Sequence, residues 1–588
     1  MQYILIMEKN KNNRLLIFLF AAMAAMFISC ATVAPPPSEV FFSPVEWQGN
    51  TLVGTRYGLI EGIKDRDQTL AWLGIPYAAP PVGELRWKAP RKPEPWQGLR
   101  RADRFGHKSA QRSLLTGTIT GSEDSLYLNV WRPSSLEKSL PVYVWVHGGS
   151  NTSGAANESK GYYGHSLASK ANLVFVSINY RLDVFGWFSH PALKTKDDPD
   201  SDSGNYGTLD IIAALEWVRE NIESFGGDPG NVTIAGESAG ALNVLSLLIA
   251  PKAKGLFQRA VIESGYTHGP AISPEAFAVN LGMRLALRQN RAISCEEASR
   301  LLAAQSNHQL ASWLRSASQR ELLQLTRPAG KEILSIPCPI FDGFVLPTDG
   351  FEALADPQRR ANVPIIIGTN REETKLFLQL AMNPWDPYYQ RLVEVSSLLW
   401  KAEGADSIAD AYGRSPAAAA SLDSGEYPPA PEVYLYRFDW GAPDEEETNV
   451  MGGIASRRLG ASHAMEIPFF LQTDNLFGSG FPLRIYTKAN KNGRLALQNA
   501  IGEYLGAFAR NGDPNEGIDS SAVGRIFWEP WDPASEKPSF LVLDAGFKEL
   551  LLRIEQGRVR REDVILEIAD NSSPSLKDHF IRLAPLFL

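Results

Sequence analysis

Cysteine is scarce in this sequence, with three residues in 588. So few cysteines exclude a fold held together by a disulfide framework. Basic residues are not in excess either, because 58 Lys and Arg stand against 66 Asp and Glu and the formal net charge is −8 at pH 7. A nucleic-acid partner is therefore not expected, since phosphate binding needs a basic surface. The sequence leaves open whether Cys295 and Cys338 form a disulfide.

Motifs for metals and cofactors are also absent. The chain has no His-Glu-x-x-His, no Cys-x-x-Cys and no phosphate-binding glycine loop. We therefore expect no metal and no organic cofactor. No internal repeat is visible, and the length is compatible with several domains or with one large α/β domain.

A short apolar segment near the N-terminus, residues 15–28, follows a basic stretch. A membrane span needs about 20 apolar residues, so this segment is shorter than a transmembrane helix and is typical of a signal-peptide core. It ends in Phe27-Ile-Ser-Cys30. That ending is similar to the lipobox of bacterial lipoproteins, in which the cysteine is lipidated and becomes the new N-terminus.

We therefore expect residues 1–30 to be a signal peptide of the lipoprotein type, with Cys30 as the lipidated residue. Residues 31–45 would then form a proline-containing tether. The protein would be exported and attached to a membrane of the bacterial cell envelope through its lipid anchor. The alternative is that Cys30 is one more apolar residue of an ordinary signal peptide or of an uncleaved anchor.

Ser238 lies between two glycines, directly after a pattern that predicts a strand. Residues 232–235 are typical of a buried strand, and the apolar segment 241–249 predicts a buried helix. A serine in a sharp strand-to-helix turn needs small residues two positions before and after it, which Gly236 and Gly240 provide. This pattern is that of a nucleophile elbow, so Ser238 is the candidate nucleophile.

A serine nucleophile needs a histidine that accepts its proton and a carboxylate that orients the histidine. In the fold that carries this elbow both partners follow the serine, the acid before the histidine. The histidines after Ser238 are His268, His308, His463 and His579. We identify no strand-end acid before the first two, and the last lies in a polar tail. By elimination, His463 is the candidate base.

Two adjacent glutamates are candidates for the acid. The strand pattern of residues 363–368 is followed by Glu372 and Glu373. Catalytic groups lie at the carboxyl ends of strands in open α/β sheets. Spacing alone does not choose between the two, and either one is also compatible with a solvated loop charge.

The reaction also needs N–H donors for the oxygen that becomes negatively charged. The strand pattern of residues 141–146 runs into His147-Gly-Gly-Ser150. This loop is of the His-Gly-Gly type found in lipases and esterases. Without Ser238 it would be interpreted as a glycine turn.

With these segments in place, the sequence resembles the type-B carboxylesterases, a family that includes bacterial p-nitrobenzyl esterases and the cholinesterases. The resemblance extends from about Val53 to about Val542. The segments that carry it, in chain order, include Leu73–Trp87, Glu123–Val130, Ile178–Leu182, Phe225–Pro229, Phe341–Gly343, Tyr434–Tyr436 and Phe508–Pro514.

The resemblance implies an α/β-hydrolase fold, with a large and mostly parallel central sheet, helices on both faces and helical insertions over the active site. It implies a catalytic domain over residues 46–550, and it leaves the packing of the tail at 551–588 open. The Asn-x-Asp/Glu-Glu-Gly motif of the family aligns the catalytic acid with Glu373, and the catalytic histidine aligns with His463.

The resemblance also implies roles for residues around this triad. The oxyanion donors would be the N–H groups of Gly149, Ser150 and Ala239. A buried polar network behind the histidine would consist of Glu237, Ser264 and Glu466. Buried carboxylates are costly unless they are hydrogen-bonded, so these residues are expected to support the triad rather than to react.

Three departures from the family pattern concern the site. Ser150 and Asn151 replace a third glycine and an aromatic residue, which puts the geometry of the Ser150 donor in question. Ser109 and Ser125 stand where the family has cysteines. The loop at 110–124 has no aromatic residue that could hold a quaternary ammonium, so a choline ester is not expected as the preferred substrate.

The stretch between Glu373 and His463 contains several aromatic residues, namely Trp385, Tyr388, Tyr389 and Trp400. They either line an apolar pocket for the substrate or pack between helices.

The leading hypothesis is a serine carboxylic ester hydrolase that forms an acyl-enzyme on Ser238, with His463 as base and Glu373 as acid. Its partners would be a small-molecule ester and a membrane, and its oligomeric state is left open. The alternatives are a non-catalytic cholinesterase-like surface-binding protein, or a lipase or amidase of the same fold.

Overall fold

The computed structural model describes residues 46–113, 116–267, 273–326, 337–414, 429–443, 449–474, 485–518 and 524–584. The predicted signal peptide, Cys30 and the tether lie outside these residues. Residues Ser43–Leu588 belong to one compact unit. No helix in the described part of the chain has the length and apolarity that a membrane span requires.

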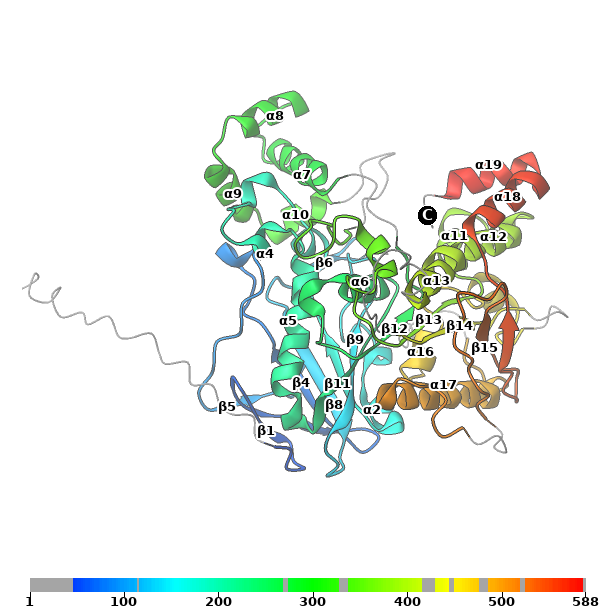
Figure 1. Cartoon of the computed structure of the whole chain (residues 1–588). Coiled ribbons are helices and arrows are strands. Elements are labelled where there is room, and N and C mark those ends of the chain that lie inside the picture. The colour runs from blue at the N-terminus through cyan, green and yellow to red at the C-terminus, as the bar shows by residue number, and fades with distance from the viewer. Residues whose placement is uncertain are drawn as a thin grey trace, which may run out of the picture. The chain divides into compact units, whose positions relative to one another are not determined.

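An 11-stranded sheet organises the chain, with the strand order β16-β15-β14-β13-β12-β11-β9-β10-β8-β4-β3 (Figure 1). Its strands are β3 (Ile63–Asp65), β4 (Thr69–Pro76), β8 (Tyr127–Pro133), β9 (Leu140–Val146), β10 (Val174–Ile178), β11 (Gly227–Glu237), β12 (Arg259–Glu263), β13 (Ile365–Asn370), β14 (Val433–Phe438), β15 (Ser539–Leu543) and β16 (Arg553–Gln556). Strands β9 to β15 are parallel, and the strands towards both edges pair antiparallel. The expected large, mostly parallel sheet is confirmed.

Two smaller sheets lie beside the large one. They consist of β1 (Leu52–Thr55), β2 (Gly58–Glu61) and β5 (Leu99–Arg101), and of β6 (Gln111–Arg112) and β7 (Ile119–Thr120).

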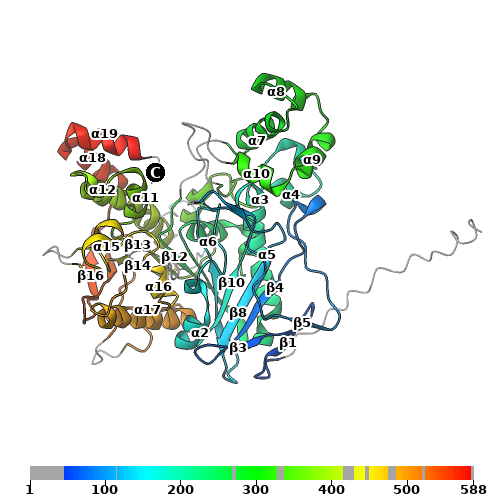
Figure 2. The same cartoon turned by 180° about the vertical axis from the view of Figure 1, so that it is seen from behind.

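The central strands are apolar along their whole length because helices cover both faces of the sheet. In β9, for example, all seven residues are buried. One face packs against α5 (Tyr206–Asn221) and α6 (Ala239–Ile249). The other face packs against α2 (His165–Ala171), α16 (Ile467–Phe470) and α17 (Lys491–Asn511), which lie together in Figure 2.

Two groups of helices lie at the upper end of the sheet in Figure 1. The first group is α7 (Pro274–Arg288), α8 (Cys295–Ala303), α9 (Asn307–Ser316) and α10 (Gln319–Leu325). The second is α11 (Lys375–Ala381), α12 (Tyr389–Lys401), α13 (Ser407–Gly413), α18 (Arg561–Asn571) and α19 (Pro574–Leu583). Helices α7 to α10 follow the carboxyl end of β12, and α11 to α13 follow that of β13, so they lie at the edge of the sheet where the candidate residues are. Helices α18 and α19 follow β16 and contact α12. The remaining described α-helices are short, α3 (Asp183–Gly186), α4 (Pro199–Asp202) and α15 (Gly453–Arg458), and short 3₁₀ and π turns lie between the elements.

The C-terminal segment packs on the rest of the chain. Strand β16 adds an edge to the central sheet, and α18 and α19 contact α12. Leu576 and Leu583 of α19 belong to the same apolar cluster as Trp400 of α12.

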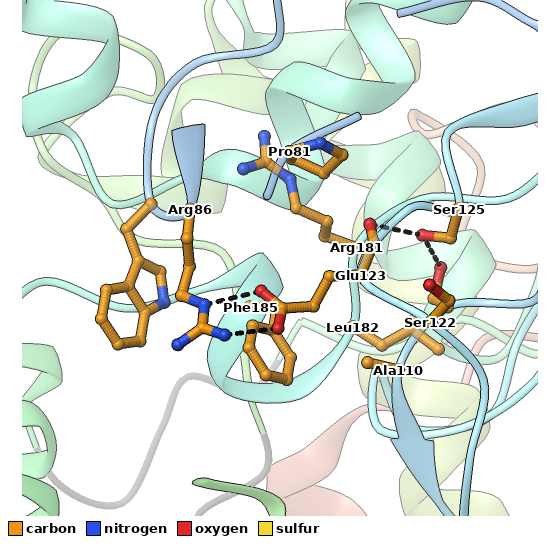
Figure 3. Close-up of a pocket in the computed structure, with 11 residues that line it drawn as sticks. Pro81, Arg86, Ala110, Ser122, Glu123, Ser125, Arg181, Leu182 and Phe185 are labelled. Atoms are coloured by element: carbon orange, nitrogen blue, oxygen red, sulfur yellow. Dashed lines mark hydrogen bonds and ion pairs between the residues drawn. The ribbon is translucent and has the colours of Figure 1, made fainter. Parts of the chain in front are cut away.

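The two serines that stand where the family has cysteines lie next to each other. They line one pocket with the Arg86–Glu123 ion pair that Figure 3 shows. Ser109 Oγ is 3.0 Å from Ser125 Oγ and donates to the carbonyl of Tyr180 at 2.6 Å. Beside them Arg86 and Glu123 form a two-point ion pair, with Nε to Oε2 at 2.6 Å and Nη2 to Oε1 at 2.5 Å. The loop is thus held by polar contacts instead of a covalent bond.

Candidate active site

The candidate residues meet at one edge of the sheet because parallel strands end there. Ser238 follows β11, Ser264 follows β12, and Glu373 lies in the turn after β13. His463 comes from the connection between α15 and α16. The carboxyl edge of such a sheet is where ligands bind in open α/β folds.

Ser238 occupies a strained turn. Its backbone has φ 59° and ψ −123°, outside the regions that L-residues ordinarily occupy. A Cβ at position 236 would lie 2.6 Å from the carbonyl carbon of Gly240, and a Cβ at 240 would lie 2.1 Å from the carbonyl oxygen of Val146. The close approach of strand and helix therefore requires both glycines, as the sequence pattern predicts.

Two features hold the elbow and prepare it for an anion. The N–H of Ser238 donates to the carbonyl of Glu263 at 2.9 Å, which ties the turn to β12. Ala239 is the first residue of α6, and the first N–H groups of a helix have no acceptor within the helix. Such a helix start attracts negative charge.

Glu373 and His463 are joined by two hydrogen bonds. The Nδ1 of His463 is 2.7 Å from Oε2 of Glu373, and the backbone N–H of His463 donates to the backbone carbonyl of Glu373 at 3.2 Å. The other oxygen, Oε1, accepts from the N–H of Asn370 at 2.8 Å. Glu373 therefore fixes both the ring orientation and the loop that carries His463.

Glu372 points elsewhere. Its carboxylate accepts from the Nζ of Lys375 at 2.7 Å, from Gln390 at 3.0 Å and from the N–H of Ala461 at 3.1 Å. Glu372 thus links the turn after β13 to the connection between α15 and α16 without contacting His463 itself.

The second ring nitrogen of His463 also faces a carboxylate. Nε2 lies 3.2 Å from Oε1 of Glu237, and it forms no hydrogen bond with any described residue, Ser238 included. Burial alone would lower the pKa of His463, but the charges of Glu237 and Glu373 together raise it to about 9. Both ring nitrogens of His463 thus face a carboxyl group, and burial raises the pKa of one of these carboxyls, Glu237, to about 8 against the opposing charge of His463.

Ser264 and Glu466, which the resemblance groups with Glu237, are hydrogen-bonded to each other. Ser264 Oγ donates to Oε1 of Glu466, and the side-chain amide of Asn370 donates to Oε2. Burial raises the pKa of Glu466, and the charge of Glu373 adds to that rise. Glu237 contacts His463 directly, with its Oε1 3.2 Å from Nε2.

The glycine loop after β9 lies against the elbow. A Cβ at Gly148 would be 2.7 Å from the carbonyl oxygen of Glu237 and 3.1 Å from the Cβ of Ser238. Gly149 and Ser150 have φ values of 108° and 56°. Ser150 thus adopts a left-handed conformation that favours glycine, which explains why the family has a glycine there.

The four aromatic residues between Glu373 and His463 were expected either to line a substrate pocket or to pack between helices, and their positions differ. Trp400 is 8% exposed, its ring centroid lies 5.0 Å from that of His463, and its Nε1 donates to the carbonyl of Gly265 at 2.9 Å. Trp385 is 54% exposed. Tyr389 is buried and donates to the carbonyl of Lys375 at 3.1 Å, and Tyr388 contacts His579. Of these four aromatic residues, only Trp400 contacts a residue of the proposed triad.

Three residues near the triad were not predicted. The ring of Phe377 stacks on Trp400 and lies 5.1 Å from His463. Asn370 donates its backbone N–H to Glu373 and its side-chain amide to Glu466, and the backbone carbonyl of Glu263 accepts from the N–H of Ser238. A glutamate inside the apolar pattern of residues 259–263 is a signal that could have indicated a buried acid.

Cys295 is exposed in α8 and Cys338 is buried. Among the described residues Cys295 forms no disulfide, so the two do not pair with each other.

Comparisons with known proteins agree on one family. A model of the carboxylesterase family matches residues 49–424. The para-nitrobenzyl esterase of Bacillus subtilis is 35% identical over 492 residues, which cover 79% of this chain and 90% of that protein. A medium-chain fatty acyl-CoA hydrolase precursor of Anas platyrhynchos is 31% identical over 577 residues, which cover 90% of this chain and 92% of that protein.

Solved structures give the same result. A p-nitrobenzyl esterase aligns with a TM-score of 0.62 and 30% identity, over 86% of this chain and 97% of that one. A Geobacillus stearothermophilus carboxylesterase aligns with a TM-score of 0.63 and 29% identity, over 86% and 98%.

Proposed function

Because this chain belongs to the carboxylesterase family and is a carboxylic ester hydrolase of the α/β-hydrolase fold, we propose that Ser238 is its nucleophile, His463 its general base and Glu373 the acid. The observation that supports this most directly is the 2.7 Å contact of His463 Nδ1 with Glu373, next to an elbow that carries Ser238.

The proposed reaction proceeds in two halves. Ser238 Oγ attacks the ester carbonyl while His463 accepts the hydroxyl proton, and the alcohol leaves with that proton. Water then attacks the acyl-enzyme while His463 accepts a proton from it. His463 returns that proton to Ser238 Oγ, and the carboxylic acid is released. For either transfer Nε2 has to turn from Glu237 towards Ser238. The negative oxygen of each tetrahedral intermediate would be held by the N–H groups of Gly149, Ser150 and Ala239.

The test is Ser238→Ala on short p-nitrophenyl esters. Loss of a serine nucleophile lowers kcat by about 10⁶-fold in a serine hydrolase. Ser246→Ala is the matched control, because Ser246 is buried in α6, the helix that follows Ser238, and among the described residues its hydroxyl bonds only to the carbonyl of Leu242, at 2.8 Å. A Ser238→Ala protein that keeps most of its turnover, or a wild-type protein that a fluorophosphonate does not label, would refute the assignment.

We also propose that the protein is exported and lipid-anchored through Cys30. The support is the basic and apolar sequence before Phe27-Ile-Ser-Cys30, which is similar to a lipobox.

A further inference from the structure

Glu263 is a buried acid that the proposed reaction does not use. It ends β12 and is 0% exposed. Neither carboxylate oxygen has a hydrogen-bond partner among the described residues, and no cation of that part of the chain pairs with it. An isolated carboxylate in such a place is costly, so the group is favoured as the neutral acid.

The strand register places Glu263 beside Glu237. The two are aligned across β11 and β12, Gly368 of β13 is aligned with Glu263, and Tyr436 of β14 is aligned with Gly368. Aligned residues of neighbouring strands point to the same face. A Cβ at Gly368 would be 2.4 Å from the ring of Tyr436, so that ring lies over the glycine. Glu237, Glu263 and Tyr436 therefore form one row across the edge of the sheet.

Among the described residues, the titratable groups that interact electrostatically with Glu263 are acids or phenols. They are Glu237 of β11, Glu466 at the start of α16, Tyr143 of β9, Tyr436 of β14 and Tyr162 of the short 3₁₀ helix Lys160–Tyr162. Burial raises the pKa of Glu263 well above its usual range, and the charges of Glu466 and Glu237 add to that rise.

The two neighbouring carboxyl groups differ in one respect. Glu237 has the His463 ring 3.2 Å from its Oε1, whereas Glu263 has no cation beside it. When two adjacent carboxyls share one proton, the proton resides where the negative charge is stabilised less. That group is Glu263. The hydroxyls of Tyr143 and Tyr436 also lack partners among the described residues, and buried polar groups of this kind bind ordered water.

We propose that Glu263 is a positioning residue, which carries the proton of the Glu237–Glu263 pair and donates it as a hydrogen bond through one water, so that Glu237 stays ionised opposite His463. The proton comes from solvent and is not consumed in turnover. The inference rests on the proposed role of His463 as base.

The test compares the pH dependence of kcat/KM for a short p-nitrophenyl ester in three variants. The acid limb of this profile is the part in which kcat/KM falls as the pH decreases. Glu263→Gln keeps a neutral hydrogen-bond donor, so its acid limb should lie at the same pH as in the wild type. Glu263→Met keeps the volume but removes the donor, so Glu237 takes up a proton and no longer raises the pKa of His463. The acid limb should then move to lower pH by about one unit, as it should in Glu237→Gln.

Two results would overturn the proposal. If the acid limb of Glu263→Gln moves as far as that of Glu237→Gln, Glu263 is ionised in the native protein. If the acid limb of Glu263→Met stays at the wild-type pH, the Glu263 side chain only fills space.

A second measurement does not depend on turnover or on the folding of the Met variant. In the Ser238→Ala protein, the infrared spectrum at neutral pH should contain a protonated-carboxyl band that disappears on adding Glu263→Gln. Absence of that change refutes the proposal. Failure of the proposed triad would instead appear as activity that survives Ser238→Ala.

Discussion

Both ring nitrogens of His463 face carboxylates, and this has a direct consequence for the pH dependence of the enzyme. The base must be neutral to accept a proton from Ser238, while Glu237 and Glu373 raise its pKa to about 9 against the effect of burial. Activity should therefore rise as the pH rises through about 9 and fall below it, because the imidazolium then predominates.

Glu237→Gln tests that relation at a single residue. Loss of one negative charge beside Nε2 lowers the pKa of His463, so the acid limb of kcat/KM should move to lower pH by about one unit. A pH profile of p-nitrophenyl ester hydrolysis measures it. Glu536→Gln, at an exposed glutamate, should leave the limb in place. An unchanged limb in Glu237→Gln would show that Glu237 does not act on the base.

At the scale of elements, α12 and the turn before it hold two tryptophans that the sequence could not distinguish. Trp400 packs against His463 and Phe377, whereas Trp385 is exposed and has Arg458 over its ring. Trp400→Ala should widen the pocket and shift the relative kcat/KM by about tenfold in favour of longer acyl chains. An acyl-chain panel measures this shift.

Trp385→Ala is the matched control, because it removes the same side chain from the surface. The hypothesis of a pocket wall fails if both variants keep the wild-type chain-length preference, or if Trp385→Ala changes it as much as Trp400→Ala.

The Ser109–Ser125 contact offers a stability test on another element. The two hydroxyls are 3.0 Å apart and 16 positions apart in the chain. Replacing both by cysteine should create the bridge that the family has, and a loop of about 15 residues is stabilised by about 3 kcal/mol. Thermal unfolding with and without reductant measures the gain. Equal Tm values in both conditions would show that no bridge forms or that it is strained.

At the scale of the whole molecule, the anchor is a prediction that concerns only the N-terminus. Labelled palmitate fed to expressing cells should be incorporated into the full chain and not into Cys30→Ala, and the variant should leave the membrane fraction. Esterase activity per molecule should be equal, because the residues of the triad all lie in Ser43–Leu588. Incorporation that persists in Cys30→Ala would refute the lipidation site.

Much of the fold was predictable because its signals are local. The apolar strand patterns at 141–146, 232–235 and 363–368 each became a strand of the central sheet. The glycines around Ser238 follow from steric limits within a few residues. The resemblance added chain order and selected Glu373, which spacing alone could not.

The sequence by itself determined the elbow, the α/β class and the short set of possible bases, since strand period and turn sterics act over a few residues. Only the tertiary structure decided which groups touch. His463 meets a glutamate 90 positions earlier in the chain, and Glu372 is held away by Lys375. Glu263 lies beside Glu237 because two strands pair in one register. Such contacts depend on how distant segments cross at the sheet edge, and no local pattern encodes that crossing.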